Sequence, residues 1–298
     1  MDLDYLVIGH VTRDLTASSV GPVRRESEAV PPRLGGTAAY AARTARALGC
    51  GVGVVTSAAP DLKLREALGD VSIALRAARV STTFVNVYDG RRRQVVRSVA
   101  RGIEPGAVPD GWHASLVHIA PVARECDPSL VTSFPKAFIG ITPQGWMREW
   151  DDTGCVTARP WLEAEMILPH ADAVVLSEED VAADRSLALE YARQTRCLVL
   201  TEGAVGCTVY TAGDAHQIPA PKVREADPTG AGDVFAACFF YMLQQTQDPY
   251  RAARFANCCA ARSVARPGLS GVPLTGEIAR CRRLMTGAGN DGHSLRAG

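Results

Sequence analysis

The sequence lacks an excess of either charge, because 32 lysines and arginines balance 32 aspartates and glutamates in 298 residues. Nucleic-acid-binding proteins usually carry a basic surplus, and the one basic run, Arg91-Arg92-Arg93, is short enough to be a solvated turn. No apolar run approaches the ~20 residues of a membrane span, and the first residues lack the features of a signal peptide. We therefore expect a soluble, cytoplasmic protein that binds neither nucleic acid nor a membrane.

Several common motifs are also missing. The nine cysteines contain no CxxC pair, which argues against a structural zinc site, and their irregular spacing does not suggest a disulfide framework. Cys258 and Cys259 are sequence neighbours, which rarely bridge, so we expect reduced cysteines. The GxxxxGK[ST] string of P-loop kinases is absent, and the glycines of 49–53 follow a predicted helix and precede a strand, the reverse of the dinucleotide fingerprint.

Apolar strand-like segments alternate with helical segments along most of the chain. Continuous apolar strands separated by helices predict a mostly parallel sheet that is covered on both faces. Strands are expected at 5–9, 52–56, 116–119, 137–142, 173–176, 197–201 and 207–211, and helices at 37–48, 161–168, 187–195, 233–244, 250–264 and 276–285. Residues 286–298 are glycine-rich and polar, which predicts a flexible tail.

One stretch departs from this alternation. Residues 81–88 carry β-branched and aromatic side chains at alternating positions, Asp89-Gly90 is a strong hairpin turn, and 93–100 is typical of a return strand. The segment is therefore either a surface hairpin or a lid that closes over a substrate.

The string Asp227-Pro228-Thr229-Gly230-Ala231-Gly232-Asp233 precedes a strongly apolar helical segment. Glycines let the backbone approach a ligand closely, and a helix N-terminus offers unsatisfied N–H groups and partial positive charge. Together they predict an anion hole suited to a phosphoryl group. Asp233 beside this hole is a candidate general base, although an aspartate there could also simply cap the helix.

This string resembles the C-terminal signature of the PfkB (ribokinase-like) carbohydrate kinase family. The segment 33–42, R-L-G-G-T-A-A-Y-A-A, resembles the N-terminal Gly-Gly signature of the same family. The resemblance implies a ribokinase-like three-layer α/β/α domain over 1–285 with a mostly parallel central sheet. It also implies a small inserted antiparallel β lid, formed mainly by about 11–33 and 80–101, through which relatives often form homodimers.

The resemblance implies roles for individual residues. Asp233 would be the base, with Gly230, Ala231 and Gly232 forming the anion hole for the γ-phosphoryl group of ATP, which brings Mg²⁺. Asp14 would hold acceptor hydroxyls, and Gly35 and Gly36 would admit the acceptor to the backbone. Further candidates for acceptor binding are Tyr40, Asn86, Gln94, Gln144 and Arg148, and those for nucleotide binding are Ser177, Thr201, Gly203, Gly206 and Asn257.

The chain departs from the family pattern at several positions. Tyr40 stands where sugar kinases carry an asparagine, so it either donates one hydroxyl contact or packs in the helix. Ser177-Glu178-Glu179-Asp180 replaces the metal-and-phosphate motif Asn-x-x-Glu, so Asp180 or Glu179 could hold Mg²⁺, directly or through water. The same string also fits a serine N-cap with an acidic first turn. Asp227 and the loop 266–268 match the place where many members bind a monovalent cation such as K⁺.

The acceptor is the least determined part of the prediction. Apart from Arg13 and Arg97, the acceptor region has no arginine or lysine cluster for a phosphorylated substrate, and Arg148 could instead pair with Glu149, Asp151 or Asp152. A neutral polyol is therefore favoured, either a cyclitol such as myo-inositol, in a branch resembling inositol kinases, or a sugar. A nucleoside kinase with Tyr40, Phe84 and Trp146 around the base, and a non-catalytic nucleotide-binding protein, remain the alternatives.

Overall fold

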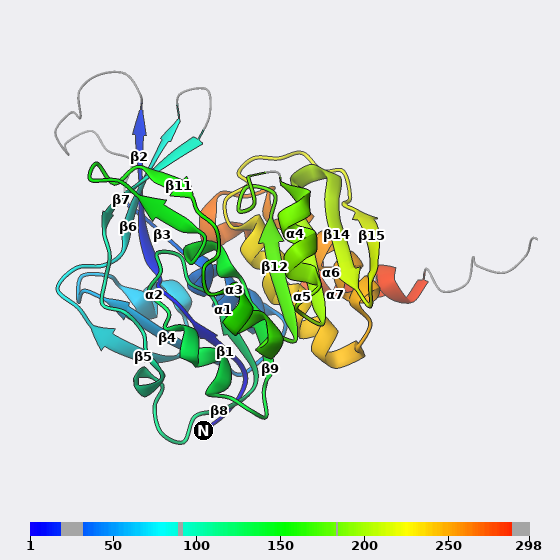
Figure 1. The fold of residues 1–298 in the computed structure, drawn as a ribbon, viewed down its shortest axis with the longest axis horizontal. Coiled ribbons are helices and arrows are strands. Elements are labelled where there is room, and N and C mark those ends of the chain that lie inside the picture. The colour runs from blue at the N-terminus through cyan, green and yellow to red at the C-terminus, as the bar shows by residue number, and fades with distance from the viewer. Residues whose placement is uncertain (19–31, 89–91, 183, 288–298) are drawn as a thin grey trace, which may run out of the picture.

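The computed structural model describes residues 1–18, 32–88, 92–182 and 184–287. Its largest element is a nine-stranded sheet with the order β15-β14-β13-β12-β9-β8-β1-β4-β5, in which all pairs are parallel except β13 with β14 and β14 with β15 (Figure 1). Its strands are β1 (Asp2–Ile8), β4 (Val52–Ala58), β5 (Ser72–Ala77), β8 (His113–Ile119), β9 (Phe138–Ile141), β12 (Ala173–Ser177), β13 (Cys197–Thr201), β14 (Gly206–Thr211) and β15 (Asp214–Pro219).

Helices cover both faces of this sheet. On β1, Tyr5 and Val7 face one apolar core and Leu6 and Ile8 face the other, as the two-residue period of a strand requires. The first core is closed by α1 (Thr37–Ala47), α2 (Leu64–Leu68), α5 (Ala231–Thr246), α6 (Pro249–Ser263) and α7 (Thr275–Gly287), and the second by α3 (Ala164–Ile167) and α4 (Arg185–Ala192). The predicted three-layer α/β/α fold with a mostly parallel sheet is therefore confirmed.

Individual elements differ from the expected ones for local reasons. The helix expected over 161–168 is only the short α3, and a 3₁₀ turn follows at Leu168–His170, where Pro169 cannot continue an α-helix. The edge strands β5 and β15 were not predicted. In β15 only Ile218 is buried, so the strand lacks the apolar pattern that marks the inner strands.

A second, four-stranded sheet extends beyond the main sheet (Figure 1). It has the order β3-β2-β6-β7 and consists of β2 (Thr12–Ser18), β3 (Arg33–Gly35), β6 (Thr83–Tyr88) and β7 (Arg92–Ser98). The antiparallel pairing of β6 with β7 confirms the predicted hairpin, whose turn at 89–91 lies outside the described residues. The parallel pairing of β2 with β6 was not predicted. A two-stranded ribbon, β10 (Arg148–Trp150) and β11 (Val156–Ala158), lies beside it.

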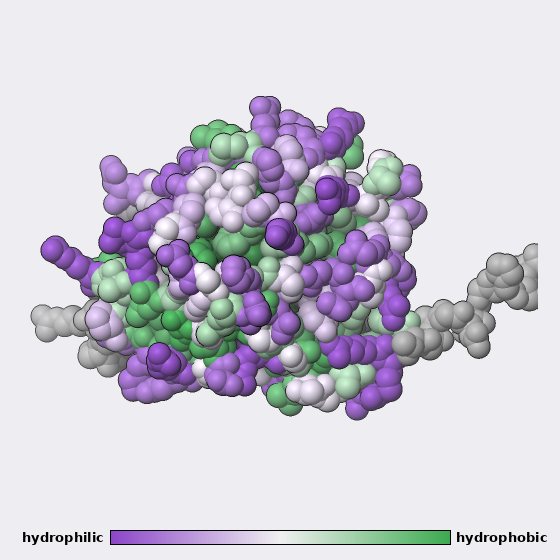
Figure 2. All heavy atoms as spheres, turned by 90° about the horizontal axis from the view of Figure 1, so that it is seen from below, coloured by the Kyte–Doolittle hydropathy of each residue, from purple (hydrophilic) through white to green (hydrophobic). Residues whose placement is uncertain are grey.

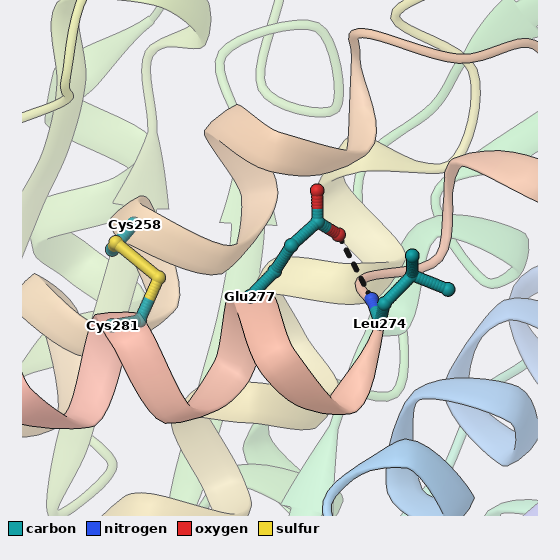
Figure 3. Close-up of a disulfide and its surroundings, with 4 residues drawn as sticks. All are labelled: Cys258, Leu274, Glu277 and Cys281. Carbon is teal, nitrogen blue, oxygen red and sulfur yellow. Dashed lines mark hydrogen bonds between the residues drawn. A yellow bond between two sulfur atoms is a disulfide. The ribbon is translucent and has the colours of Figure 1, made fainter.

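The expectation that every cysteine is reduced is wrong for one pair. Cys258 of α6 and Cys281 of α7 form a disulfide with their Cα atoms 5.8 Å apart (Figure 3). The pairing depends on how α6 and α7 pack against each other, which cysteine spacing does not reveal. The other seven cysteines are free.

The surface carries mainly polar groups with separate apolar areas. Figure 2 shows this on the face that lies at the bottom of Figure 1, opposite the four-stranded sheet. Within the described ranges, no helix combines the length and apolar character that crossing a membrane requires.

Candidate active site

A cavity of about 870 Å³ lies beside the carboxyl ends of the parallel strands, where ligands usually bind in open α/β sheets. The residues that line it come from segments far apart in the sequence, between Thr12 and Asp233. Its lining includes these sequence-predicted site residues: Asp14, Gly36, Tyr40, Gln94, Gln144, Arg148, Ser177, Glu179, Thr201, Gly203, Gly230, Ala231, Gly232 and Asp233. Gly35, Asn86, Asp180, Gly206, Asp227 and Asn257 do not line it.

The Gly230 loop opens α5 at the wall of this cavity. Gly230 is the N-cap and has a φ of 81°, a left-handed conformation that favours glycine. The Ala231 amide donates to the Pro228 carbonyl at 3.1 Å, whereas Gly232 is exposed with open space around its Cα. The Gly232 amide lies in the first turn, where no intrahelical acceptor is available. In the predicted anion hole, the Gly232 amide is therefore the backbone donor most available to a ligand.

Asp233 stands in the first turn of α5, and Thr37, the first residue of α1, donates a 2.8 Å hydrogen bond from Oγ1 to Asp233 Oδ1. Burial raises the pKa of Asp233 to about 6, and the charges of Asp14 and Asp180 add to this effect. The Thr37 hydrogen bond and the positive charge of Arg148 act in the opposite direction. A carboxylate with this pKa is ionised at neutral pH yet remains basic enough to accept a proton.

Asp14 lines the cavity from strand β2, where Thr12 Oγ1 donates to its Oδ1 at 2.8 Å. A side chain at Gly35 would overlap the Asp14 carboxylate, so glycine is required at this position for Asp14 to keep its place. Gly36 has a φ of 84°, and a side chain there would lie 2.5 Å from the His10 carbonyl oxygen. Gly35 and Gly36 therefore leave space for two groups of the protein itself, the Asp14 carboxylate and the His10 carbonyl.

Tyr40 adopts the packed arrangement that was one of the alternatives left open by the sequence. Its side chain is almost fully buried, and a Cβ at Gly230 would overlap its ring. Burial, followed by the charges of Asp233, Asp14 and Asp227, raises the pKa of the Tyr40 hydroxyl well above its ordinary value. Tyr40 therefore packs against the Gly230 loop, and it also contributes to the cavity wall.

Side chains from the four-stranded sheet and from the segment after β9 include the further residues that were predicted to bind an acceptor. Gln94 lines the cavity and donates from Nε2 to Oδ1 of the buried Asn86 at 3.0 Å. The Arg148 guanidinium lies 5.8 Å from the Phe84 ring centroid, and its Nη1 donates to the Val122 carbonyl at 3.4 Å. Gln144 lines the cavity next to Arg148.

The serine and acidic residues after β12 form a compact turn. Ser177 donates from its amide and from Oγ to Asp180 Oδ2, each at 2.8 Å, and the Asp180 amide donates back to Ser177 Oγ at 3.2 Å. This is the reciprocal bonding expected of a capping sequence, although no helix begins here. Glu178 and Glu179 line the cavity instead. In the described part of the chain, no three His, Cys, Asp or Glu residues gather in a way that could hold a metal ion.

The segment between β13 and β14 places two of its predicted residues on the cavity. Thr201 and Gly203 line it, whereas Gly206 is buried, with a φ of 124°. Asn257 is also buried, and its Nδ2 donates to the Ile218 carbonyl at 2.9 Å. In this structure Asn257 therefore ties α6 to β15, away from the cavity.

Sequence reasoning missed several residues of the site, among them Thr37, Glu178 and Glu202. Thr37 directly follows the Gly-Gly pair, which was the only available signal. Glu202 lines the cavity with its side chain 1% exposed, and it pairs with Arg185 at 2.5 Å. Glu202 also accepts hydrogen bonds from Thr208 Oγ1 at 3.0 Å and Gln217 Nε2 at 3.1 Å. Its place at the end of strand β13 was a signal, because such positions meet at the ligand-binding edge.

Comparison with known proteins agrees with this geometry. Residues 161–275, which include the Gly230 loop and Asp233, match the pfkB family carbohydrate kinase. The matched segment covers less than half of the chain. The match confirms the resemblance that the C-terminal glycine signature indicated.

Curated relatives of the chain include two kinases of different acceptors. It is 33% identical to inositol 3-kinase of Zea mays over 132 residues, which are 43% of this chain and 34% of the maize protein. It is 27% identical to fructokinase of Escherichia coli over 228 residues, which are 67% of this chain and 73% of that protein. The matched segment thus spans only about a third of the maize protein.

Solved structures establish the fold of the chain along its length. A pyrophosphate-dependent kinase in the ribokinase family, complexed with a pyrophosphate analog and myo-inositol, superimposes with a TM-score of 0.77 at 20% identity, covering 93% of this chain and 99% of the other. Ribokinase from Thermotoga maritima superimposes with a TM-score of 0.72 at 18% identity, covering 94% and 99%. The ribokinase-like fold class is therefore confirmed.

Proposed function

We propose that this chain transfers the γ-phosphoryl group of ATP to a hydroxyl of a small neutral polyol, and that its preferred acceptor is a cyclitol such as myo-inositol. The observation that carries the proposal is the placement of Asp233. Its carboxylate stands at the open N-terminus of α5, in the same cavity as Asp14, with a pKa of about 6.

In the proposed reaction, an acceptor hydroxyl oxygen bonds to the γ-phosphorus while the bond from that phosphorus to the bridging oxygen of ADP breaks. Asp233 accepts the hydroxyl proton, and Asp14 orients the acceptor by accepting hydrogen bonds from its other hydroxyls. Amides at the start of α5 stabilise the negative charge on the transferred group. Arg148, whose positive charge lowers the pKa of Asp233, lies near enough to contribute.

The acidic residues beside Ser177 suit a magnesium ion that arrives with the nucleotide. Mg²⁺ usually keeps several water ligands and takes one or two carboxylates plus phosphate oxygens, so a dedicated protein cage is not required. The Glu179 carboxylate, which lines the cavity, is the candidate to hold it, whereas Asp180 is engaged by Ser177 and Glu178 pairs with Arg185 at 3.0 Å. Bound there, Mg²⁺ would neutralise phosphate charge.

The acceptor assignment is supported by the lining and by the relatives. The acceptor side offers the polar groups of Asp14, Gln94 and Gln144, which suit hydroxyls. Inositol 3-kinase of maize and the myo-inositol complex support a cyclitol, while the E. coli fructokinase supports a sugar. The nucleoside alternative is weakened because Trp146 is buried and stacks on Trp161 at 5.8 Å instead of lining the cavity.

A second candidate donor is inorganic pyrophosphate. On the donor side, the described lining residues are Ser177, Glu178, Glu179, Thr201, Glu202 and Gly203, and none of these offers an aromatic or large apolar surface to a nucleobase. A fold neighbour that uses pyrophosphate is consistent with this alternative. ATP remains the preferred donor because of the similarity to the pfkB family carbohydrate kinases.

The four-stranded sheet is proposed to act as the lid of this site, since Asp14, Phe84 and Gln94 reach the cavity from its strands. The same sheet is the proposed surface for homodimers, and the cytoplasm is the proposed compartment. Chemical cross-linking and light scattering of the purified chain test whether it forms homodimers.

A panel assay tests the proposed function. myo-Inositol, fructose, ribose and adenosine are each offered with ATP and with pyrophosphate, and phosphorylated product is measured by mass spectrometry. We expect the highest kcat/KM for myo-inositol with ATP. Turnover of adenosine alone would eliminate the polyol assignment. Product formation with pyrophosphate but not ATP would replace the donor, and binding of ATP without any product would support a non-catalytic role.

A further inference from the structure

The loop of residues 266–272 contacts Asp227 through the Gly268 amide, at a place where members of the pfkB family hold a monovalent cation. A bound cation needs several oxygen atoms that are not engaged elsewhere. The candidate oxygens here belong to the Asp227 carboxylate and to the carbonyl groups of the loop 266–272.

The Asp227 carboxylate is already well engaged. Its Oδ1 accepts a hydrogen bond from the Thr229 amide and its Oδ2 one from the Gly268 amide, both at 3.0 Å. The Nη1 atom of Arg33 lies 3.6 Å from the same Oδ2. Burial favours a raised pKa for Asp227, but the hydrogen bonds from Thr229 and Gly268 and the Arg33 charge outweigh it, so the pKa is lowered. Asp227 is therefore an ionised carboxylate that already has a cationic partner.

Arg33 reaches Asp227 along the surface of the loop. A Cβ placed at Gly268 would lie 3.9 Å from Arg33 Cδ, which is ordinary contact distance, so the aliphatic part of Arg33 lies over Gly268. The side chain of Asp227 is 17% exposed and that of Arg33 55%. The arginine thus covers the carboxylate from the solvent side, where an ion would otherwise enter.

A second guanidinium occupies carbonyl oxygens of the loop. Arg266 donates from Nε to the Ser270 carbonyl at 2.9 Å and from Nη2 to the Gly271 carbonyl at 3.4 Å. The same side chain pairs with Glu277 through hydrogen bonds of 2.9 and 2.8 Å. Glu277 also accepts from the Leu274 amide at 2.9 Å, at the start of α7 (Figure 3). The loop is therefore held in shape by the protein's own positive charge.

We propose that Arg33 is a positioning residue that supplies, at Asp227, the positive charge that a monovalent cation would otherwise supply, so that this chain needs no K⁺. Arg33 pairs with Asp14 in the register of β2 and β3, and Asp227 begins the string that leads to Gly230 and Asp233. The Arg33–Asp227 ion pair therefore connects the strand that carries the acceptor-binding aspartate to the catalytic loop. The inference builds on the proposed function but concerns the loop rather than the acceptor.

The experiment compares the wild type with Arg33→Gln and Arg33→Lys in potassium chloride and in choline chloride at equal ionic strength. Arg196→Gln is the matched control, because Arg196 forms an exposed ion pair with Asp172 at 2.8 Å far from the loop. We expect equal wild-type kcat in both salts. Arg33→Gln should lose kcat several-fold more than it changes the KM for ATP, and should regain activity in potassium chloride. Arg33→Lys should retain most activity.

Two readouts separate this inference from the function itself. The midpoint of thermal unfolding, measured in both salts, requires no substrate. It should be equal in the two salts for the wild type and higher in potassium chloride for Arg33→Gln. A wild type that K⁺ activates or stabilises beyond choline would overturn the inference. So would an Arg33→Gln variant that behaves like Arg196→Gln in both measurements, whether or not any acceptor is phosphorylated.

Discussion

The Thr37 hydroxyl donates a 2.8 Å hydrogen bond to Asp233 Oδ1 and so joins the first residue of α1 to the first turn of α5. The two residues are 196 positions apart in the sequence. Each directly follows a glycine-rich turn, and both turns lie on the same cavity. The bond therefore connects the two signature segments at the proposed catalytic carboxylate, and it gives Thr37 a role that the sequence alone did not assign.

Replacing Thr37 with valine should shift the pH dependence of the reaction. The Thr37 hydrogen bond stabilises the ionised carboxylate and thus lowers the pKa of Asp233, which stands at about 6. Without this bond the pKa rises, so the acidic limb of kcat/KM against pH moves to higher pH. Activity should fall strongly at pH 6 and much less at pH 8, as measured by initial rates across the range.

Thr44→Val provides the control for that experiment. Thr44 is buried on the same helix, and its Oγ1 has no hydrogen-bond partner in the described structure. Its replacement should leave the pH profile unchanged. An acidic limb that stays in place in Thr37→Val would show that Asp233 is not the group titrating in the profile.

Asp233→Asn should retain ATP binding and lose turnover. General-base catalysis contributes on the order of 10²–10⁴ in rate, so a loss of this size in kcat with little change in nucleotide affinity is expected. Single-turnover rates and calorimetric ATP binding measure the two quantities. A variant with near-normal kcat would refute the assignment of Asp233 as the base.

The same substitution should also stabilise the fold at neutral pH. Because burial raises the pKa of Asp233 from 3.8 to about 6, the protonated form favours folding, and this contribution is lost as the pH rises through about 6. Asparagine removes the cost of the buried charge. The unfolding free energy of Asp233→Asn should exceed that of the wild type by at most ~3 kcal/mol at pH 8 and by almost nothing near pH 4. A gain that is independent of pH would contradict this origin.

The sequence predicted the fold and most of the lining of the cavity, but not the geometry within it. Continuous apolar segments such as β12 and β13 are buried on both faces and are therefore recognisable, whereas the exposed β15 is not. Glycine-rich strings in the sequence locate the turns. Glycine is required at position 35, however, because the Asp14 carboxylate on the neighbouring strand occupies the space of a side chain. Only the pairing of β2 with β3 reveals this contact.

The raised pKa of Asp233 was also beyond the sequence. No acidic residue lies within three positions of it in the chain, and the shift comes from burial, with Asp14 and Asp180 added by folding. The burial of Asn257 and the engagement of Asp180 by Ser177 likewise depend on contacts that spacing does not encode.

Asp14→Ala and Gly35→Ala should impair acceptor binding in the same direction. The first removes the carboxylate, and the second adds a methyl group that would overlap it. Both should raise the KM for the acceptor by roughly tenfold or more, since a hydrogen bond to a charged group contributes about 1.5–3 kcal/mol, while the KM for ATP changes little. Gly106→Ala, where the added Cβ meets nothing within 4 Å and φ is not positive, controls for the loss of a glycine. An effect confined to ATP would contradict the assigned role of Asp14.

Cys258→Ser should destabilise the chain through α7 without altering the site directly. The disulfide to Cys281 closes a segment with a sequence separation of 23 residues, and cross-links of this length contribute about 3 kcal/mol by restricting the unfolded chain. The midpoint of thermal unfolding should therefore fall, and adding a reductant should lower that of the wild type to a similar value while leaving Cys258→Ser unchanged. Cys155→Ser, which removes a free and partly exposed thiol, should respond to reductant as the wild type does. A wild type whose unfolding midpoint does not depend on reductant would show that the cross-link contributes nothing to stability.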